Sequence, residues 1–212
     1  SAAMSEGALL EWLRSRPETS GLLGDDAAIV DPSQPVCITV DSQIEGTHVP
    51  RGIDPGVFAR RLLAVNLSDI AAMGARPTHA FLALAAPPDF PLQDFFRSFL
   101  LAAKADQVTL AGGDLSRSER LSAALTLLGQ RWPDGDWLRR DGAASGEAIW
   151  VGGNLGESAL GCRLLEHGLS NGRPSVPSAL PLDLRDYALD CLQRHLEPQA
   201  QLDLGRWLAS RA

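Results

Sequence analysis

Hydrophobic positions along the chain fall into segments with two different periods. Apolar residues at helical spacing predict helices over residues 5–15, 55–73, 92–105, 157–167, 183–195 and 199–211. Short apolar runs, several of them rich in β-branched residues, predict strands over residues 36–40, 79–86, 108–111, 121–132 and 148–151. Helices and strands therefore alternate, which indicates an α+β or mixed α/β protein.

A polar stretch at residues 132–146 interrupts this alternation. We place a domain boundary there, which predicts one domain over residues 1–135 and the start of a second, incomplete domain over 136–212. The segment 168–181 is rich in proline, glycine and serine and is expected to form a long loop. A length of 212 residues suits one large domain or one and a half smaller ones.

The composition narrows the class of protein. Hydrophobic residues make up 45% and charged residues 21%, which is typical of a globular protein. The net charge is −7 and no basic stripe stands out, so a nucleic acid is not expected as a partner. Three scattered cysteines, no membrane-length apolar run and no signal-peptide pattern at the first residues favour a cytoplasmic protein away from membranes.

Aspartates beside apolar segments are the strongest chemical signal in the first 114 residues. They are Asp25, Asp26, Asp41, Asp69 and Asp114. Carboxylates rarely adjoin a hydrophobic core unless they are paired or bind a metal. Two of them about 4 Å apart repel by roughly 4 kcal/mol at an effective dielectric constant near 20. Oxygen ligands without paired Cys or His suit Mg²⁺, so the pattern predicts a magnesium site that binds phosphates.

Each of these segments also has a structural explanation. Asn66 and Asp69 lie three residues apart on one helix face, as either a buried hydrogen-bond network or a ligand site. The Gly-Asp-Asp at 24–26 is typical of a turn, and Asp41 could cap one. The Gly-Gly-Asp at 112–114 is either a tight turn or a backbone that a phosphate can approach. The recurrence of Asp in four separate segments favours a shared site.

Three further features carry weaker signals. His48 lies in a polar loop without a partner for nucleophilic catalysis, so we assign no nucleophile or general base. Arg140 lies in an expected turn and is either solvated or within reach of a phosphate. The glycine-rich run at 152–156 precedes a helix but matches neither nucleotide-binding fingerprint, which favours an ordinary strand-to-helix turn.

Five motifs together resemble the thiamine-monophosphate kinases. They are GDDAA at 24–28, DSQIEGTH at 41–48, LAVNLSDIAAMGARP at 63–77, GGD at 112–114 and RDGA at 140–143. The resemblance runs from about residue 20 to the end of the chain. The motif at 63–77 and the Glu-Gly-x-His at 45–48 are specific to these kinases. Gly-Gly-Asp is shared more widely in a superfamily that includes aminoimidazole ribonucleotide synthetase, selenophosphate synthetase and the hydrogenase maturation factor HypE.

The resemblance implies a PurM-like fold. Its N-terminal domain would have a mixed sheet packed by helices, and the sheets of two subunits would pair into a barrel in a homodimer. A partial second α/β domain would follow. The implied reaction is direct in-line transfer of the ATP γ-phosphoryl group to thiamine monophosphate, assisted by several Mg²⁺ ions.

The resemblance also implies roles for individual residues. The implied metal ligands are Asp26, Asp41, Asp69, Asp114 and Thr39, with Val40 beside them. The implied ATP contacts are Gly113, Asp114 and Arg140, and His48 is the implied contact to thiamine monophosphate.

The sequence departs from the family pattern in places. Ser42 stands where threonine is more common, and Val49 replaces a usual aromatic residue. An Asp-x-Ser-Asp-Gly-Leu motif of the family has no counterpart in residues 1–212, so we do not expect these residues alone to be fully active. Two alternatives remain: another ATP-using synthetase of the superfamily, or a non-catalytic nucleotide-binding or dimerisation module.

Overall fold

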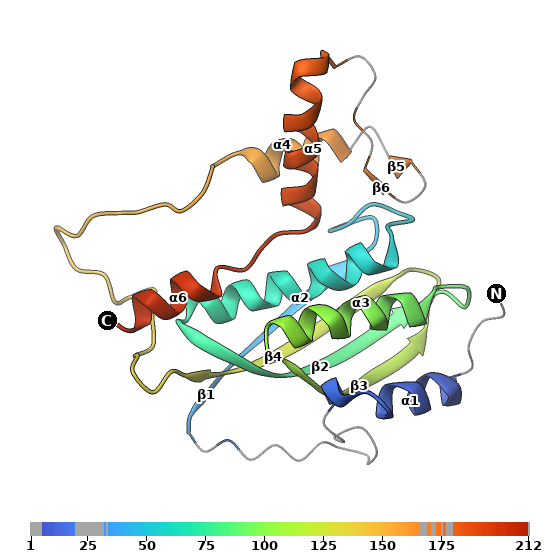
Figure 1. The fold of residues 1–212 in the computed structure, drawn as a ribbon, viewed down its shortest axis with the longest axis horizontal. Helices are drawn as coiled ribbons and strands as arrows, with labels where there is room; N and C mark the ends of the chain where they lie inside the picture. Colours follow the sequence, from blue (N-terminus) through green and yellow to red (C-terminus); the bar gives the residue numbers. More distant parts are fainter. Residues whose placement is uncertain are drawn as a thin grey trace.

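The computed structural model describes residues 6–19, 32, 34–165, 169–170, 173–174, 176 and 180–211 (Figure 1). The helices are α1 (Glu6–Arg14), α2 (Pro55–Ala72), α3 (Leu92–Ala105), α4 (Glu157–Leu165), α5 (Leu182–Leu196) and α6 (Leu202–Ala209), with a 3₁₀ turn at Pro17–Thr19. The strands are β1 (Val36–Ile44), β2 (Ala75–Ala86), β3 (Thr109–Arg117), β4 (Ser122–Arg131), β5 (Leu169–Ser170) and β6 (Arg173–Pro174). None of these described helices is both long and apolar enough to cross a bilayer.

Strands β1 to β4 form one mixed sheet in the order β1-β4-β2-β3. Strands β2 and β3 are parallel and are joined by α3, whereas β4 is antiparallel to both β1 and β2. The expected mixed α+β architecture, with helices packed on a mixed sheet, is therefore confirmed. The order makes β1 and β3 the two edges of the sheet, a fact that decides the geometry of the candidate site.

Helix α2 begins and ends where its sequence requires. The Asp54 carboxylate accepts hydrogen bonds from the backbone N–H groups of Gly56 and Val57, at 2.9 and 3.0 Å, and Pro55 occupies the first turn. At the other end Gly74 has φ +66°, a conformation that glycine adopts without strain. The chain then enters β2 directly at Ala75. These signals place the polar residues of α2 at fixed turns.

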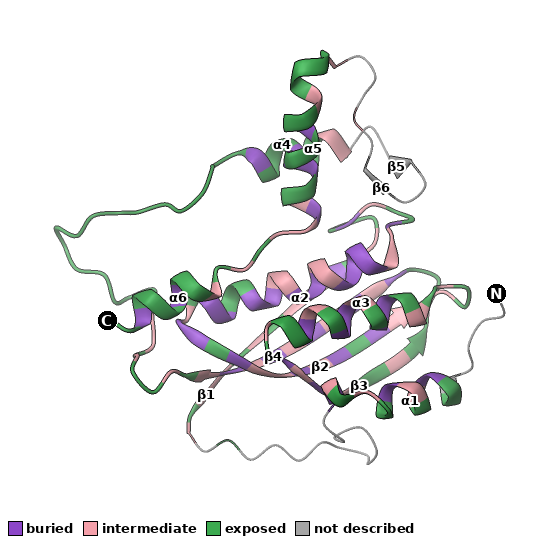
Figure 2. Cartoon of the chain, in the orientation of Figure 1, coloured by how far each residue is buried: buried purple, intermediate pink, exposed green. Residues whose placement is uncertain are grey.

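Helices α2 and α3 cover one face of the sheet, and the core lies between them (Figures 1 and 2). The aromatic stripe of α3 supplies much of this core: Phe95 and Phe99 are fully buried and Phe96 almost so. The Phe95 ring packs edge-to-face on Phe96, with centroids 5.3 Å apart, and lies 5.9 Å from the Phe58 ring of α2. Burial of this stripe fixes α3 against α2.

The other face of the sheet is open in the described part of the chain. Along β1 the side chains alternate, so that Thr39, Asp41 and Gln43 face α2 while Ile38 and Val40 face away. Ile38 and Val40 are each 62% exposed, an unusual position for β-branched apolar residues. We call this surface the open face; it includes Phe81, Ala83, Ala124 and Leu128, which alternate with the buried residues of β2 and β4.

Four strand predictions need correction, the first being β2, which begins at Ala75 rather than at residue 79. Strand β1 runs beyond Asp41 to Ile44, and β3 runs through residues 112–114, so these aspartates lie within strands rather than after them. Residues 148–151 form no strand, although their composition favours one. Ile149 and Trp150 are 96% and 89% exposed there. A strand needs a hydrogen-bonded neighbour, which composition alone does not reveal.

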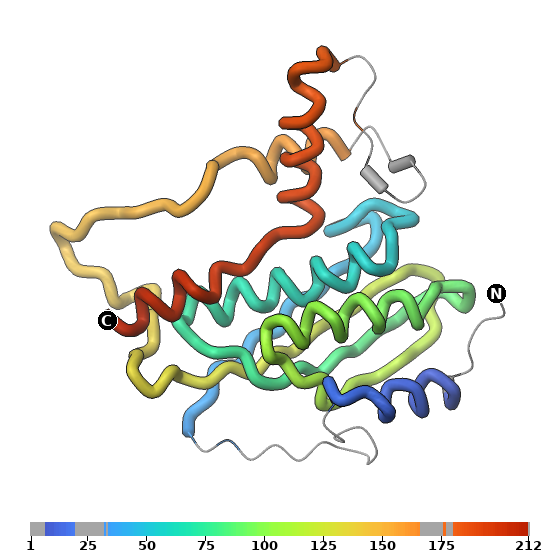
Figure 3. Tube along the Cα trace, in the orientation of Figure 1, coloured from blue at the N-terminus to red at the C-terminus, as the bar shows by residue number. Residues whose placement is uncertain are grey.

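The chain after β4 leaves the sheet, and its last helix, α6, returns to lie beside α2 (Figure 3). Helices α4 and α5 pack closely at Gly161, where a Cβ atom would overlap the carbonyl group of Cys191. Helix α6 then lies along α2, and a Cβ atom at Gly205 would overlap the carbonyl oxygen of Ala71. The domain boundary near residue 135 stays a prediction.

Candidate nucleotide and metal site

Three polar contacts join alternate residues of β1 to successive turns of α2, and we call them the polar ladder. Its rungs are Thr39–Asp69, Asp41–Asn66 and Gln43–Arg61, at 2.6, 3.0 and 2.9 Å. From Arg61 to Asp69 the helix rises roughly 12 Å. From Thr39 to Gln43 the strand extends roughly 13 Å. The two spacings match, so an antiparallel strand and helix can pair polar residues over three rungs.

The middle rung is a buried hydrogen-bond network. Asn66 is fully buried; its Oδ1 accepts a hydrogen bond from the backbone N–H of Asp41, and its Nδ2 donates to the carbonyl of Leu62 at 2.9 Å. Both ends of the amide are therefore satisfied within the protein. Of the polar pair in α2, Asn66 thus belongs to a buried hydrogen-bond network and fixes the backbone of Asp41.

Asp69 is exposed at the outer rung. The hydroxyl of Thr39 donates to its Oδ2 at 2.6 Å, which orients the carboxylate. Asp41 is half-buried, and its Oδ1 accepts a hydrogen bond from the backbone N–H of Ser42 at 2.8 Å. Thr39, Asp41 and Asp69 are thus brought to one border between β1 and α2. All three offer oxygen ligands, the chemistry that a hard divalent cation prefers.

Asp114 lies elsewhere, on the edge strand β3. The register aligns Asp41 with Leu125, Leu82 and Gly113 across the sheet. Three strand spacings of about 4.8 Å separate the Cα atoms of Asp41 and Gly113 by roughly 14 Å. Asp114 belongs to the next row, with Ser42, Ala124 and Ala83, which faces the open side. Within one chain Asp114 and Asp41 are therefore far apart and on opposite faces.

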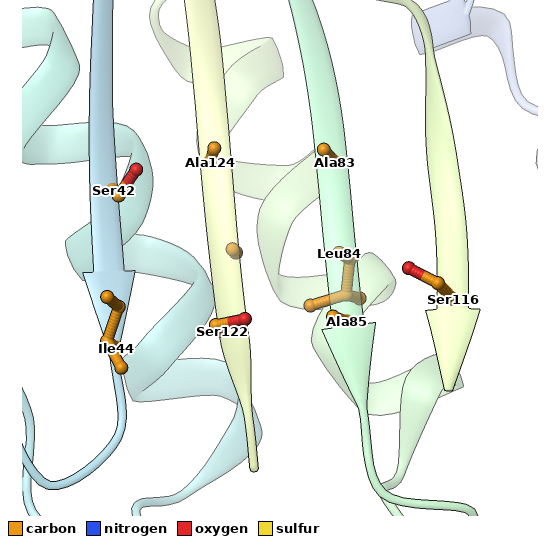
Figure 4. A pocket seen from close by; sticks show the side chains of 9 residues that line it. Ser42, Ile44, Ala83, Leu84, Ala85, Ser116, Ser122 and Ala124 are labelled. Atoms are coloured by element: carbon orange, nitrogen blue, oxygen red, sulfur yellow. The ribbon is translucent and has the colours of Figure 1, made fainter. Parts of the chain in front are cut away.

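The open face near Asp114 has a shallow hollow lined mostly by small residues, with Ile44 and Leu84 as the larger ones (Figure 4). The side chains of Ser42, Ala124 and Ala83 follow one another across three strands, and Ser122 and Ser116 lie near them. The Ser116 hydroxyl donates to Oδ2 of Asp114 at 3.3 Å, so the two side chains share this face. Small side chains leave the sheet open to a partner or ligand here.

Gly113 is required by the sheet itself. It has φ +156°, and a Cβ atom there would overlap the carbonyl oxygen of Leu82 in the neighbouring strand. A register shift between Ala80 and Phe81 accompanies this close approach. The glycine therefore permits close strand pairing, and its contact with a nucleotide stays a prediction.

The remaining predicted residues are dispersed. His48 lies exposed in the turn after β1, and its Nδ1 accepts a hydrogen bond from the backbone N–H of Ile44 at 3.1 Å, which leaves Nε2 to donate outward. Arg140 lies in an exposed turn. Two residues before it, the backbone N–H of Leu138 donates a hydrogen bond to the carbonyl of Met73, at the end of α2. Asp25 and Asp26 lie outside the described residues.

Within the described residues, no three His, Cys, Asp or Glu side chains come close enough to form a metal-binding group. The structure brings Asp41, Asp69 and Thr39 together and leaves Asp114 and Arg140 apart from them. Sequence reasoning missed Arg61 and Gln43, which form the third rung of the polar ladder. A charged residue inside the apolar pattern of α2 was the available signal for Arg61.

Comparison with known proteins shows which family the chain resembles. Residues 24–130 match the family model described as "AIR synthase related protein, N-terminal domain". The thiamine-monophosphate kinase of Salmonella typhimurium is 35% identical over 198 residues, covering 92% of this chain and 57% of that protein. The corresponding kinase of Rhodopirellula baltica is 37% identical over 179 residues, covering 75% and 55%. The chain thus spans little more than half the length of these relatives.

Solved structures show the same likeness. The crystal structure of thiamine-monophosphate kinase from Stenotrophomonas maltophilia K279a has a TM-score of 0.78 and 35% identity, covering 98% of this chain and 65% of that one. The structure of AaThiL complexed with AMPPCP and TMP has a TM-score of 0.70 and 26% identity, covering 99% and 65%. The family-model match and these relatives lead to one conclusion: the chain belongs to the family of AIR synthase related proteins.

Proposed function

We propose that this chain carries the nucleotide- and metal-binding part of an enzyme that phosphorylates thiamine monophosphate with ATP. The observation that carries the proposal is the likeness, over nearly the whole chain, to thiamine-monophosphate kinases. One of the similar structures is a complex with AMPPCP, an ATP analogue, and TMP. The three free thiols, Cys37, Cys162 and Cys191, are consistent with the reducing cytoplasm, where we place the protein.

The border between β1 and α2 is the part of the site that suits Mg²⁺. We assign Asp41, Asp69 and Thr39 as ligands, because their donor atoms are all oxygens and Asp69 is exposed. Bound there, Mg²⁺ would neutralise charge on the phosphates. Thr39 orients the Asp69 carboxylate, and Asn66 holds the backbone of Asp41. Phosphoryl transfer depends mainly on alignment and charge, so no protein nucleophile is needed.

Other residues complete the proposed site. Gly113, Asp114 and Arg140 are assigned to the nucleotide, and His48 to thiamine monophosphate. The outward Nε2–H of His48 suits a phosphate oxygen, since Nδ1 is already occupied by the backbone of Ile44. Asp26 is assigned as a further metal ligand from its motif alone.

We further propose a homodimer in which the open faces of two sheets pair into a barrel. Ile38 and Val40, each 62% exposed, supply apolar contacts on this face. Among the strands that the structure describes, the edge strands β1 and β3 each leave one row of backbone N–H and C=O groups without a strand partner. Edge strands of this kind are templates for pairing with another chain.

The same dimer would complete the metal site. Two oxygen ligands on opposite sides of one Mg²⁺ ion are roughly 4 Å apart. The separation of roughly 14 Å between Asp41 and the β3 row exceeds what two Asp side chains and one ion can span. If the β1 edge of one copy meets the β3 edge of the other, the strands that carry Asp41 and Asp114 in different copies become neighbours, about 4.8 Å apart instead of roughly 14 Å. We therefore assign Asp114 to the site of the second copy.

The proposed activity is tested on the complete gene product by ADP release coupled to a spectrophotometric signal. ADP should appear only when Mg²⁺-ATP and thiamine monophosphate are both present, and thiamine diphosphate should form in equal amount. Thiamine in place of its monophosphate is the matched control and should give no product. ADP release without thiamine monophosphate would point to another ATP-using enzyme. If calorimetry shows binding of AMPPCP but the assay shows no turnover, the protein is a non-catalytic nucleotide-binding module.

The homodimer is tested by placing a charge on the open face. Ile38→Glu should convert a dimer into a monomer at micromolar concentration, because a carboxylate would be buried between two apolar sheets. Leu101→Glu is the matched control, since Leu101 is 72% exposed on α3, away from the open face. Light scattering should give the mass of two chains for the original protein and for Leu101→Glu. A dimer that survives Ile38→Glu would argue against this interface.

A further inference from the structure

Arg61 connects three elements that are distant in sequence. It lies on α2, and its Nε donates to Oε1 of Gln43 on β1 at 2.9 Å. A second guanidinium nitrogen, NH1, donates to the backbone carbonyl of His195 near the end of α5. Helix α5 stands away from the sheet, and its C-terminal end reaches α2 (Figure 1). The guanidinium therefore holds the β1 strand and the end of α5 at one point of α2.

The neighbouring Arg60 shows what is unusual about Arg61. Arg60 makes an ion pair with Glu197, at 2.7 Å, in a partly exposed position. Arg61 makes its hydrogen bonds to neutral oxygens, and among the described residues no carboxylate lies within ion-pair distance of it. Burial lowers the pKa of Arg61, while the charge of Asp41 acts in the opposite direction. Removing a cation from water to make hydrogen bonds with neutral oxygens lowers the stability of the fold. The position of Arg61 is therefore explained by the two acceptors that it joins, and not by an ion pair.

The contact between Gln43 and Arg61 can affect the position of Asp41 on β1. Gln43 is 4% exposed and lies two residues after Asp41, on the same side of β1. Asp41 is held by Asn66 through one backbone hydrogen bond, so its carboxylate depends on β1 staying in register with α2. The third rung adds a second fixed point on the far side of Asp41. Loss of that rung would let the end of β1 shift relative to Asp69.

We propose that Arg61 is a positioning residue that keeps Asp41 aligned with Asp69 and couples this alignment to the position of α5. The proposal rests on the proposed kinase function for its effect on turnover. Its effect on the strand and on Mg²⁺ binding is independent of the substrate. A planar guanidinium suits the task, because it can donate in two directions at once.

The test compares Arg61→Met and Arg61→Lys with Arg60→Met in the complete gene product. Arg61→Met should lower kcat about tenfold to a hundredfold at saturating substrates, as expected for a small misplacement of reacting groups. Arg61→Lys should recover part of that loss, because an ammonium group can reach one of the two acceptors. Arg60→Met is the matched control: it removes a neighbouring arginine that also contacts the C-terminal end of α5, and kcat should stay within about threefold. Gln43→Met removes the partner of Arg61 and should lower kcat like Arg61→Met.

Two measurements do not require turnover. Hydrogen exchange at the Asp41 amide should be at least about tenfold faster in Arg61→Met than in Arg60→Met. Titration with Mg²⁺ alone in a calorimeter should show weaker binding in Arg61→Met but not in the control. If Arg61→Met matches Arg60→Met in exchange and Mg²⁺ affinity, the positioning role is wrong. If the original protein shows no kinase activity while these two differences persist, the kinase proposal fails and the positioning role stands.

Discussion

Asp69→Asn is expected to lower kcat/KM of the proposed kinase roughly a thousandfold. A Mg²⁺ ion held by Asp69 would contribute several kcal/mol of charge stabilisation in phosphoryl transfer, and each 1.4 kcal/mol is about tenfold in rate. Asparagine keeps an oxygen that can accept the hydrogen bond from Thr39, which Asp69 accepts at 2.6 Å. Asp69 is also exposed, so the fold should tolerate the change and Tm should move by only a few degrees. Steady-state kinetics and thermal unfolding measure both quantities.

Asp94→Asn is the matched control for this variant. Asp94 is an exposed aspartate on the neighbouring helix α3, where it lies 3.8 Å from Arg97, and its replacement should leave kcat/KM within about twofold. If Asp69→Asn needs a higher Mg²⁺ concentration for half-maximal activity and Asp94→Asn does not, the effect of the substitution lies at the metal. If Asp69→Asn is about as active as the original protein, Asp69 is not a metal ligand, and the Thr39–Asp69 contact has no role in catalysis.

Mixing two inactive variants is expected to restore activity if the site is built from two copies. Asp41→Asn and Asp114→Asn should each be inactive alone, since each loses a ligand at both sites of the dimer. In a random mixture half of the dimers carry both variants, and one of their two sites is intact, so about a quarter of the original activity should return. The measurement is kinase activity after co-expression or joint refolding of the two variants.

The matched control mixes Asp41→Asn with Asp69→Asn. Both residues lie on the polar ladder of the same chain, so every mixed dimer has one defect at each site and no activity should return. Recovery in the first mixture and not in the second would support a site shared between β1 of one copy and β3 of the other. No recovery in either mixture would contradict that arrangement.

Local sequence signals predicted much of the architecture because they act over short distances. The bounds of α3 and the burial of its phenylalanines follow from apolar spacing along one helix face. The start of α2 follows from Asp54 and Pro55, and its end from Gly74, because capping depends on the first and last turns alone. The pattern also singled out Asn66 and Asp69, although it could not separate a network from a ligand.

The tertiary structure decided which aspartates meet. Sequence places Asp41 and Asp114 beside similar apolar strands, and only the strand order shows that these strands are opposite edges of one sheet. Strand order depends on pairings between distant segments, as does the absence of a strand at residues 148–151. The different hydrogen-bond partners of Asn66 and Asp69 likewise depend on which side of α2 lies against β1.

The sequence by itself predicted the helices and a set of acidic residues beside apolar segments, because each depends on neighbours along the chain. Tertiary structure alone decided the polar ladder, the separation of Asp114 from Asp41 and the contact of Arg61 with His195. These features join residues dozens of positions apart, and their geometry follows from how the sheet and helices pack rather than from any local pattern.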